Sequence, residues 1–287
     1  MGEISVKFYN SIVMHFLWRN SRIKLSGGLL FWREIGGNSN NVVFLHGSWY
    51  NSSQWLPVME RLSLHYHCFA PDLPGFGESE FSFTHYSISQ IVESLAEYIA
   101  TLKLEKVYLV AHSLGGWIAA SYALKYSEQL LGVILISPEG INLAAVKARW
   151  RLFRCLIQKP SFLCWVLQLI YPFVRLLGAH TKIKNILQFR QKLLLSSTGT
   201  KILFRRRWTE IQAELLTEEL AFLKVKTLIL QGYKDTNIAL SMSKFYADLL
   251  PMAKLHLINS GGDNLPEQMP DIVVEKITDF LSDGDNF

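Results

Sequence analysis

A short apolar run that ends at a single serine constrains this chain more than any other feature. Residues 107–111 read Val-Tyr-Leu-Val-Ala, and His112, Ser113 and a stretch rich in small residues follow directly. The pattern predicts a buried strand, a tight turn at Ser113 and a helix. Ala111 and Gly115 flank the serine at two residues' distance, and only small side chains allow the strand and the helix to approach so closely. The turn therefore lifts the hydroxyl above the sheet, beside the amino end of a helix.

Other short apolar runs recur along the chain, and turn residues end each of them. Such runs are typical of buried parallel strands. The segments between them have helical periodicity, which predicts helices over 89–102, 114–125 and 271–281. Strands that alternate with helices predict an α/β fold with a mostly parallel central sheet flanked by helices. The predicted strands are residues 42–45, 66–70, 107–111, 132–136, 227–230 and 254–258.

The alternation of strands and helices stops in the middle of the chain. From 141 to 223 the sequence has helical periodicity and many aromatic residues but no strand pattern. An insertion of this size between two strands predicts a helical cap over the strand ends. We therefore expect one core, residues 1–140 and 224–287, with a helical cap insertion, residues 141–223. A chain of 287 residues is long enough for one large core of this kind.

Four further motifs accompany the serine turn, each next to a predicted strand or turn. They are His-Gly-Ser-Trp at 46–49, a D-x-x-G-x-G-x-S turn at 72–79, Gly-Tyr-Lys-Asp at 232–235, and a Gly-Gly-Asp segment that opens residues 261–270. In this order they resemble the α/β-hydrolase superfamily, of the cap-bearing esterase, lipase and C–C-hydrolase kind. The resemblance implies the α/β-hydrolase fold and an apolar ester or acyl substrate. Fold alone does not establish the function.

The resemblance also implies a role for each matching residue. Ser113 would be the nucleophile that attacks an acyl carbonyl, as in a carboxylic-ester-type hydrolase, and Asp235 would be the acid that orients the base. An oxyanion hole of two backbone donors would stabilise the developing charge by about 3–4 kcal/mol each. Its donors would be the N–H groups of Leu114 and of Ser48 or its neighbour Trp49, and Ala111, His112 and Gly115 would complete the nucleophile elbow.

The chain departs from the family pattern at the catalytic base. The usual histidine follows the last strand, with a proline seven residues beyond it; here Asp263 stands in that place and Pro270 lies seven residues on. A carboxylate is a much weaker base than imidazole. If the usual geometry holds, Asp263 faces Asp235, so the pKa of one carboxyl rises and the two share a proton. Glu139 is an alternative acid–base candidate.

No other histidine has the position of the missing base. His256 lies inside a predicted strand, His112 lies in the elbow and is expected to point elsewhere, and His46 belongs to the predicted oxyanion loop. His180 lies in the cap and would reach the site only if the cap folds down. The remaining histidines are expected at the surface; they are His15, His65, His67 and His85.

Three hypotheses follow from this incomplete triad. The first is a serine hydrolase of esters or related acyl compounds, slow or unconventional because its base is replaced. The second is a catalytically silent member that binds a hydrophobic ligand or a protein partner. The third is an acid–base enzyme without a covalent intermediate that uses Asp235 and Asp263.

The cap contains an unusual concentration of positive charge. Residues 140–209 contain fourteen Lys or Arg and no Asp or Glu, although the net charge of the whole chain is only +5. Aromatic residues lie between these cations, which suits peripheral contact of residues 141–209 with an anionic membrane. The alternative is an ordinary cap with solvated cations and aromatics that line a ligand pocket. We expect no nucleic acid partner, because no nucleic-acid-binding motif is present.

Composition adds expectations about cofactors and location. No metal-ligand spacing and no dinucleotide-binding glycine pattern occur, so we expect neither metal nor cofactor. The odd number of cysteines, 3, argues against a disulfide framework and favours a cytoplasmic setting, with peripheral membrane contact as the alternative. Residues 4–18 have no basic start and no small-residue cleavage site, which argues against a signal peptide.

Overall fold

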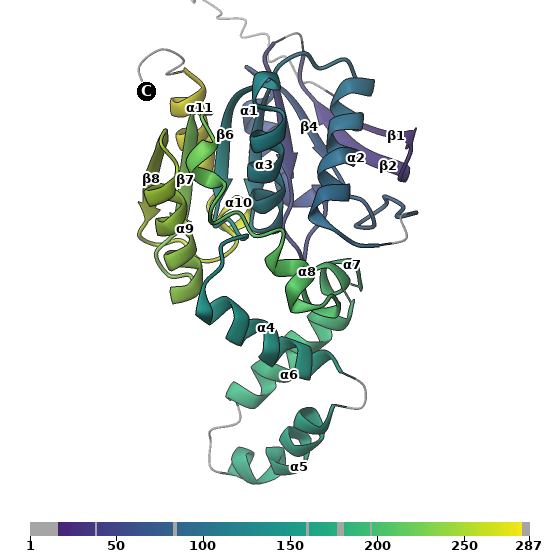
Figure 1. The fold of residues 1–287 in the computed structure, drawn as a ribbon, viewed down its shortest axis with the longest axis vertical. Helices are drawn as coiled ribbons and strands as arrows, with labels where there is room; N and C mark the ends of the chain where they lie inside the picture. Colours follow the sequence, from purple (N-terminus) through teal and green to yellow (C-terminus); the bar gives the residue numbers. More distant parts are fainter. Residues whose placement is uncertain are drawn as a thin grey trace, which may run out of the picture.

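One eight-stranded sheet forms the centre of the molecule (Figure 1). The structure, a computed structural model, describes residues 17–37, 39–82, 85–158, 161–176, 181–195 and 197–282. The strand order is β1-β2-β4-β3-β5-β6-β7-β8; β1 and β2 pair antiparallel, as do β2 and β4, and the other neighbours are parallel. The strands are β1 (Arg19–Leu25), β2 (Gly28–Ile35), β3 (Asn41–Leu45), β4 (His67–Pro71), β5 (Val107–His112), β6 (Leu130–Ile136), β7 (Thr227–Gly232) and β8 (Ala253–Ile258).

Helices cover both faces of the sheet. On one face pack α2 (Ile88–Thr101), α3 (Leu114–Lys125) and α9 (Asn237–Leu249). On the other pack α1 (Leu56–Leu62), α10 (Leu265–Gln268) and α11 (Pro270–Ser282). Within β5, Leu109 joins the core of the first face and Val110 that of the second, because successive side chains of a strand point to opposite faces. This architecture confirms the predicted α/β-hydrolase fold with a mostly parallel sheet.

The predicted elements of the core lie within two residues of observed ones at both ends. Helix α2 begins as a capped helix should, because the Ser87 side chain accepts a hydrogen bond from the Gln90 amide at 3.1 Å. The sequence patterns do not predict the antiparallel pair β1 and β2 or helices α1 and α9. Strand β1 lies at the edge of the sheet, where most of its side chains are at least partly exposed, so it lacks a continuous apolar run. Strand β2 contains the apolar run 29–32, which the sequence analysis did not single out.

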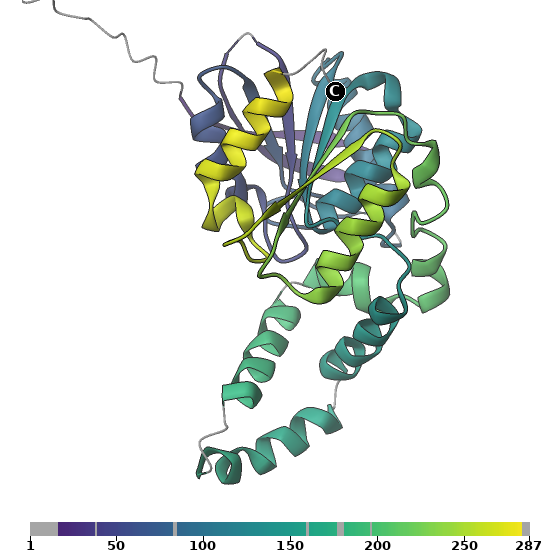
Figure 2. The same cartoon turned by 90° about the vertical axis from the view of Figure 1, so that its left-hand side faces the viewer.

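Between β6 and β7 the described chain forms helices and turns and no strand. We call residues 141–223 the helical insertion; the boundaries of this unit remain a prediction. It extends away from the core in both views (Figures 1 and 2), and its helix α5 runs through Pro172. Across the described residues, no helix is long and apolar enough to span a bilayer. The elements of the helical insertion are α4 (Ala144–Ile157), α5 (Phe162–Leu176), α6 (Thr181–Leu195), α7 (Ser197–Thr200), the π-helical turn η3 (Lys201–Arg205), α8 (Trp208–Gln212) and the 3-10 turn η4 (Leu220–Phe222).

The packing of α3 against β3 generates a test of the elbow. A Cβ added at Gly115 would lie 2.4 Å from the carbonyl oxygen of Leu45 and 2.8 Å from that of His46. We expect Gly115→Ala to lower the free energy of unfolding by about 1–3 kcal/mol, measured by urea denaturation. Ser121→Ala, on the same helix at a half-buried position, should change it by less than about 0.5 kcal/mol. Equal effects of the two substitutions would contradict the close approach.

Candidate active site

Ser113 occupies a strained turn between β5 and α3. Its backbone has φ 53° and ψ −113°, a region that costs a non-glycine residue about 1–3 kcal/mol. Hydrogen bonds hold it there: its amide donates to the Ile136 carbonyl at 2.9 Å, and its own carbonyl accepts from the amides of Trp117 and Glu139 at 3.2 and 3.1 Å. The strand, strained turn and helix follow the path that the small flanking residues Ala111 and Gly115 predict, and the role of Ser113 as a nucleophile remains a prediction.

A cavity of about 650 Å³ opens beside Ser113. It lies between the carboxyl ends of the parallel strands and the helical insertion, where open α/β sheets place their ligands. Ala111, Leu114 and Gly115 are buried and are not part of the cavity wall. The other predicted site residues are all on the wall; they are Ser48, Trp49, His112, Ser113, Asp235 and Asp263.

The donors that the sequence analysis assigns to an oxyanion hole are the backbone amides of Leu114 and of Ser48 or Trp49, and this assignment remains a prediction. Among the described residues, the amides of Trp49 and Leu114 donate no hydrogen bond to another protein group. The loop that carries Trp49 is held by the buried side chain of Gln54, whose Oε1 accepts from the Gly47 amide at 3.1 Å. Donors that are positioned before the reaction can stabilise negative charge without reorganisation.

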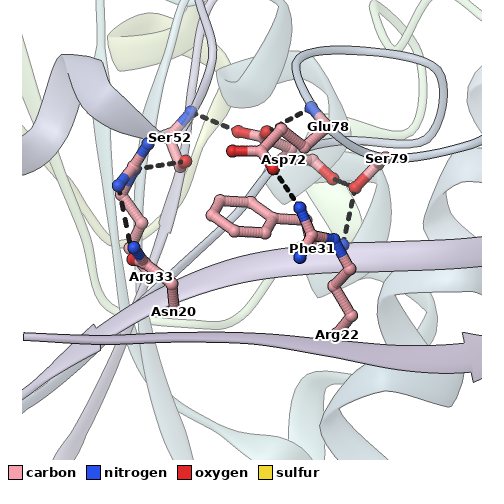
Figure 3. A network of polar contacts seen from close by, with 8 residues as sticks. All are labelled: Asn20, Arg22, Phe31, Arg33, Ser52, Asp72, Glu78 and Ser79. Carbon is pink, nitrogen blue, oxygen red and sulfur yellow. Dashed lines mark hydrogen bonds and ion pairs between the residues drawn. The ribbon is translucent and has the colours of Figure 1, made fainter.

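The turn at residues 72–79 holds the loop that carries Trp49 in place (Figure 3). The Asp72 carboxylate is buried and accepts hydrogen bonds from the amides of Ser52 and Glu78, at 2.6 and 2.8 Å. The Ser79 hydroxyl donates to the Asp72 carbonyl at 2.7 Å and accepts from the Phe31 amide at 2.9 Å. The D-x-x-G-x-G-x-S motif therefore ties the loop that carries Trp49 to strand β2 and supports the structure of this region.

His46 also acts as a structural residue of the loop. Its ring is fully buried, Nδ1 donates to the Gly47 carbonyl at 2.9 Å, and Nε2 accepts from the Leu73 amide at 3.0 Å. Burial lowers the pKa of His46 below its ordinary value. The ring is thus neutral and both nitrogens are occupied.

The sequence analysis expected His112 to point away from the site, and the structure contradicts this. It lines the cavity, and its Nε2 donates to the backbone carbonyl of Asp263 at 2.7 Å. Its Nδ1 accepts from the Gln54 amide nitrogen at 2.9 Å, and that nitrogen also donates to the Asn264 side chain at 2.9 Å. Burial lowers the pKa of His112 to about 4. A neutral ring with both nitrogens engaged cannot serve as the missing base.

The two aspartates differ in how firmly they are held. Asp235 accepts hydrogen bonds on both oxygens, from the Thr236 amide at 2.6 Å and the Gln231 side chain at 3.1 Å. Asp263 is exposed on the cavity wall, and its carboxylate accepts no hydrogen bond from the described residues. Burial, together with the charges of Asp263 and Glu267, raises the pKa of nearby Tyr50 to about 12. The two hydrogen bonds thus hold the Asp235 carboxylate in place, whereas the Asp263 carboxylate is open to a ligand.

Glu139, the alternative acid–base candidate, is engaged elsewhere. It lines the cavity, but its carboxylate forms a half-buried salt bridge with Arg149 at 3.3 Å. Its carbonyl accepts from the hydroxyl of Tyr246 at 2.7 Å. Neighbouring Ser137, which the sequence analysis did not single out, also lines the cavity and has φ 46°. No local signal predicts this conformation, because it depends on the chain path into the helical insertion.

The remaining histidines supply no base within the described part of the chain. His256 is exposed on β8, and His65 and His85 are exposed. His67 is half-buried against Glu34 at 2.8 Å, which differs from the expected surface position. His15 and His180 lie outside the described residues. Of the histidines that the structure describes, His112 is the one on the cavity wall. The described part of the chain contains no cluster of His, Cys, Asp and Glu that could hold a metal ion.

The buried state of His112 predicts how stability depends on pH. Unfolded His112 takes up a proton below its ordinary pKa of 6.5, whereas folded His112 stays neutral down to about 4. The free energy of unfolding should therefore fall as pH drops from 6.5 to 4, by about 3 kcal/mol from this residue, and be unaffected by it above 6.5. Urea denaturation of wild type and His112→Gln across this range measures the difference. A variant that keeps the full wild-type dependence would contradict the assignment.

Comparison with known proteins identifies the family of the chain. A sequence model of the alpha/beta hydrolase family matches residues 42–275. A 2-hydroxy-6-oxo-2,4-heptadienoate hydrolase of Pseudomonas putida is 24% identical over 271 residues, which cover 92% of this chain and 97% of that protein. A pimeloyl-[acyl-carrier protein] methyl ester esterase of Wigglesworthia glossinidia brevipalpis is 38% identical over 107 residues, 37% of this chain and 39% of that protein.

Other matches are either shorter or structural. The chain spans 32–42% of the length of several further curated relatives. The solved structure of a thermophilic esterase from Thermogutta terrifontis superposes with a TM-score of 0.69 at 21% identity, over 93% of this chain and 99% of that one. At that identity the superposition supports the fold alone. The family match covers most of the chain, so the chain belongs to the alpha/beta hydrolase family.

Proposed function

We propose that the protein is a serine hydrolase of an apolar ester or related acyl compound, with a carboxylate in place of the usual base. One observation carries the proposal. The strained Ser113 stands on the wall of the cavity together with Asp235 and Asp263. Ser137 has positive φ on the same wall, but only Ser113 stands between a strand and the amino end of a helix, which is the position of a nucleophile. Esterase and C–C-hydrolase activities among the relatives support the same class of chemistry.

The proposed reaction proceeds in two steps. The Ser113 hydroxyl attacks the acyl carbonyl while its proton passes to the Asp263 carboxylate, and the amides of Trp49 and Leu114 stabilise the oxyanion. The carbon–oxygen bond to the alcohol then breaks, and the alcohol leaves with that proton. Water, deprotonated by the same carboxylate, attacks the acyl-enzyme and releases the acid and Ser113. Asp235 is the second carboxylate on the cavity wall, and its hydrogen bonds to Thr236 and Gln231 hold it in place.

The walls of the cavity favour an apolar substrate. Phe204 stacks on Trp49 with ring centroids 6.3 Å apart, and Phe153 packs against Phe204 and Phe189 at 5.3 and 4.9 Å. All four rings line the cavity, so the acyl pocket beside Ser113 is built largely from aromatic surface. Pockets of this kind bind apolar groups and use a few polar atoms for orientation.

A second candidate function is binding of a hydrophobic ligand without turnover. It is favoured by the engagement of His112, which leaves the described site without any imidazole base. In a well-studied protease, loss of the triad histidine lowers turnover by about 10⁶. The third candidate is acid–base chemistry by Asp235 and Asp263 without a covalent intermediate. The proposed hydrolase differs from both because it requires a reactive Ser113.

A fluorophosphonate probe tests the nucleophile. We expect slow, stoichiometric labelling of the wild-type protein that Ser113→Ala abolishes, because the probe needs an activated hydroxyl. Ser137→Ala is the matched control, since Ser137 is also a cavity serine with positive φ, and it should label as wild type. Intact-protein and peptide mass spectrometry measure the extent and position. Absence of labelling under all conditions would reject the hydrolase proposal and leave the two non-covalent candidates.

Restoration of an imidazole tests the replaced base. We expect Asp263→His to raise kcat/KM for a short acyl ester by at least about 100-fold, which is the usual scale of general-base catalysis. The backbone of residue 263 should stay in place, because His112 binds its carbonyl and not its side chain. Asp263→Asn, which removes the charge and adds no base, should lower the activity. An unchanged rate in the histidine variant would show that Asp263 does not occupy the base position.

A further inference from the structure

Helix α5 of the helical insertion presents its apolar side chains to solvent. Five of them lie on one face and expose between 55% and 86% of their surface. Their spacing of three and four residues places them in a single stripe along a helix of 15 residues. We call these residues the α5 stripe; they are Phe162, Trp165, Leu169, Phe173 and Leu176.

The opposite side of α5 faces the protein. Cys164 is buried, and Gln168 and Tyr171 line a cavity of about 250 Å³ with residues of α6 that include Lys184 and Gln188. These inward positions lie roughly 130° around the helix from the α5 stripe. The α5 stripe therefore does not pack on the rest of the protein, unlike the apolar face of an ordinary surface helix, which packs on the core. Nothing within the described chain covers the apolar face.

The position of α5 leaves the stripe accessible. Both views place α5 at the end of the molecule farthest from the sheet, beyond α4 and α6 (Figures 1 and 2). A broad flat surface could approach this end without contact with the core. Contiguous exposed apolar surface of this kind marks an interaction site more often than it occurs by chance.

The charge of the helical insertion identifies the partner. Residues 140–209 contain fourteen Lys or Arg and no Asp or Glu. Among the described residues, salt bridges of the helical insertion are limited to Arg149 with Glu139 and Arg206 with Glu214. Further cations on α4, α5 and α6 are exposed and form no salt bridge with another described residue; they are Arg151, Arg154, Arg175 and Lys184. An apolar stripe on a unit with this excess of exposed positive charge is complementary to a lipid surface that carries negative headgroups.

We infer that the α5 stripe inserts into the interfacial layer of an anionic bilayer, with the helix lying in the membrane plane. Trp165 is well suited to that layer because its ring is apolar with one polar N–H group, and the other stripe residues supply apolar surface. The exposed cations would contact lipid phosphates, so attraction weakens as salt screens the charges. A second copy of the chain is the competing occupant of the stripe, but the excess of like charge on the helical insertion would oppose such a dimer. The inference does not depend on the activity of Ser113.

Vesicle binding tests this inference with a matched pair of variants. The probe is sedimentation with vesicles of phosphatidylcholine alone or mixed with phosphatidylglycerol, at low and high salt. Phe162→Ser with Phe173→Ser removes two side chains of the stripe. Phe222→Ser with Leu64→Ser is the control, because Phe222 is 77% exposed against 76% for Phe162 and both control positions lie outside the stripe. Thermal unfolding confirms that both variants fold as wild type.

We expect the wild-type protein to bind anionic vesicles. This binding should weaken as the salt concentration rises, and binding to neutral vesicles should be lower. The stripe variant should lose affinity by about tenfold or more, and the control variant should bind as wild type. Trp165→Phe should retain binding but lose most of the fluorescence quenching by bromolipids in the bilayer. Ser113→Ala should bind as wild type even if it is inactive, which separates this test from that of the proposed function.

Three results would overturn the inference. Failure of the wild-type protein to bind anionic vesicles at low salt would exclude a lipid surface as the partner. A stripe variant that binds as tightly as wild type would exclude the stripe as the contact. A wild-type dimer in light scattering that becomes monomeric in the stripe variant, without any lipid binding, would assign the stripe to a second copy of the chain.

Discussion

The close contact between α3 and the ends of β3 and β5 is the constraint on which the candidate site depends. The contact requires glycine at 115, because a Cβ at this position would lie 2.4 Å from the carbonyl oxygen of Leu45. Ser113 has positive φ directly before this helix, and Leu114 begins it. A larger residue at 115 would move the helix away from β3 and would displace the proposed nucleophile and the proposed donor at Leu114 together, because one backbone path positions both.

A buried polar network joins this elbow to the loop that carries Asp263. His112 binds the carbonyl of residue 263, and Gln54 bridges His112, Gly47 and Asn264. The network consists of neutral groups whose partners are protein atoms, so it can rigidify the loops at little electrostatic cost. It also explains how a histidine beside the nucleophile is unavailable as a base. Its nitrogens are committed to holding the position from which a side chain at 263 would act.

The helical insertion combines two surfaces with opposite orientation. Toward the core, the aromatic rings of α4, α6 and η3 close the cavity over Ser113. At the far end, α5 turns its apolar face outward. A membrane contact at α5 and an apolar pocket beneath α4 would place a lipid-derived substrate and its binding site on one structural unit. The two proposals remain separable, because one depends on Ser113 and the other on the α5 stripe.

The sequence by itself determined the elements whose signals are local. Continuous apolar runs identify the buried parallel strands, and the small residues around Ser113 identify the elbow, because each pattern reflects a nearby backbone requirement. The substitution at Asp263 is equally visible in the sequence. The edge strand β1 escaped prediction because its few apolar residues alternate with charges and it is stabilised by pairing with β2.

Only the tertiary structure decided the partners of the buried polar groups and the direction of α5. His112 and the carbonyl of Asp263 are separated by 151 positions, and Gln54 and Asn264 by 210, so no local pattern encodes their contact. The periodicity of α5 shows that it has an apolar face, but not whether that face points inward. That direction depends on which side α4 and α6 occupy, and packing between segments far apart in the chain determines it.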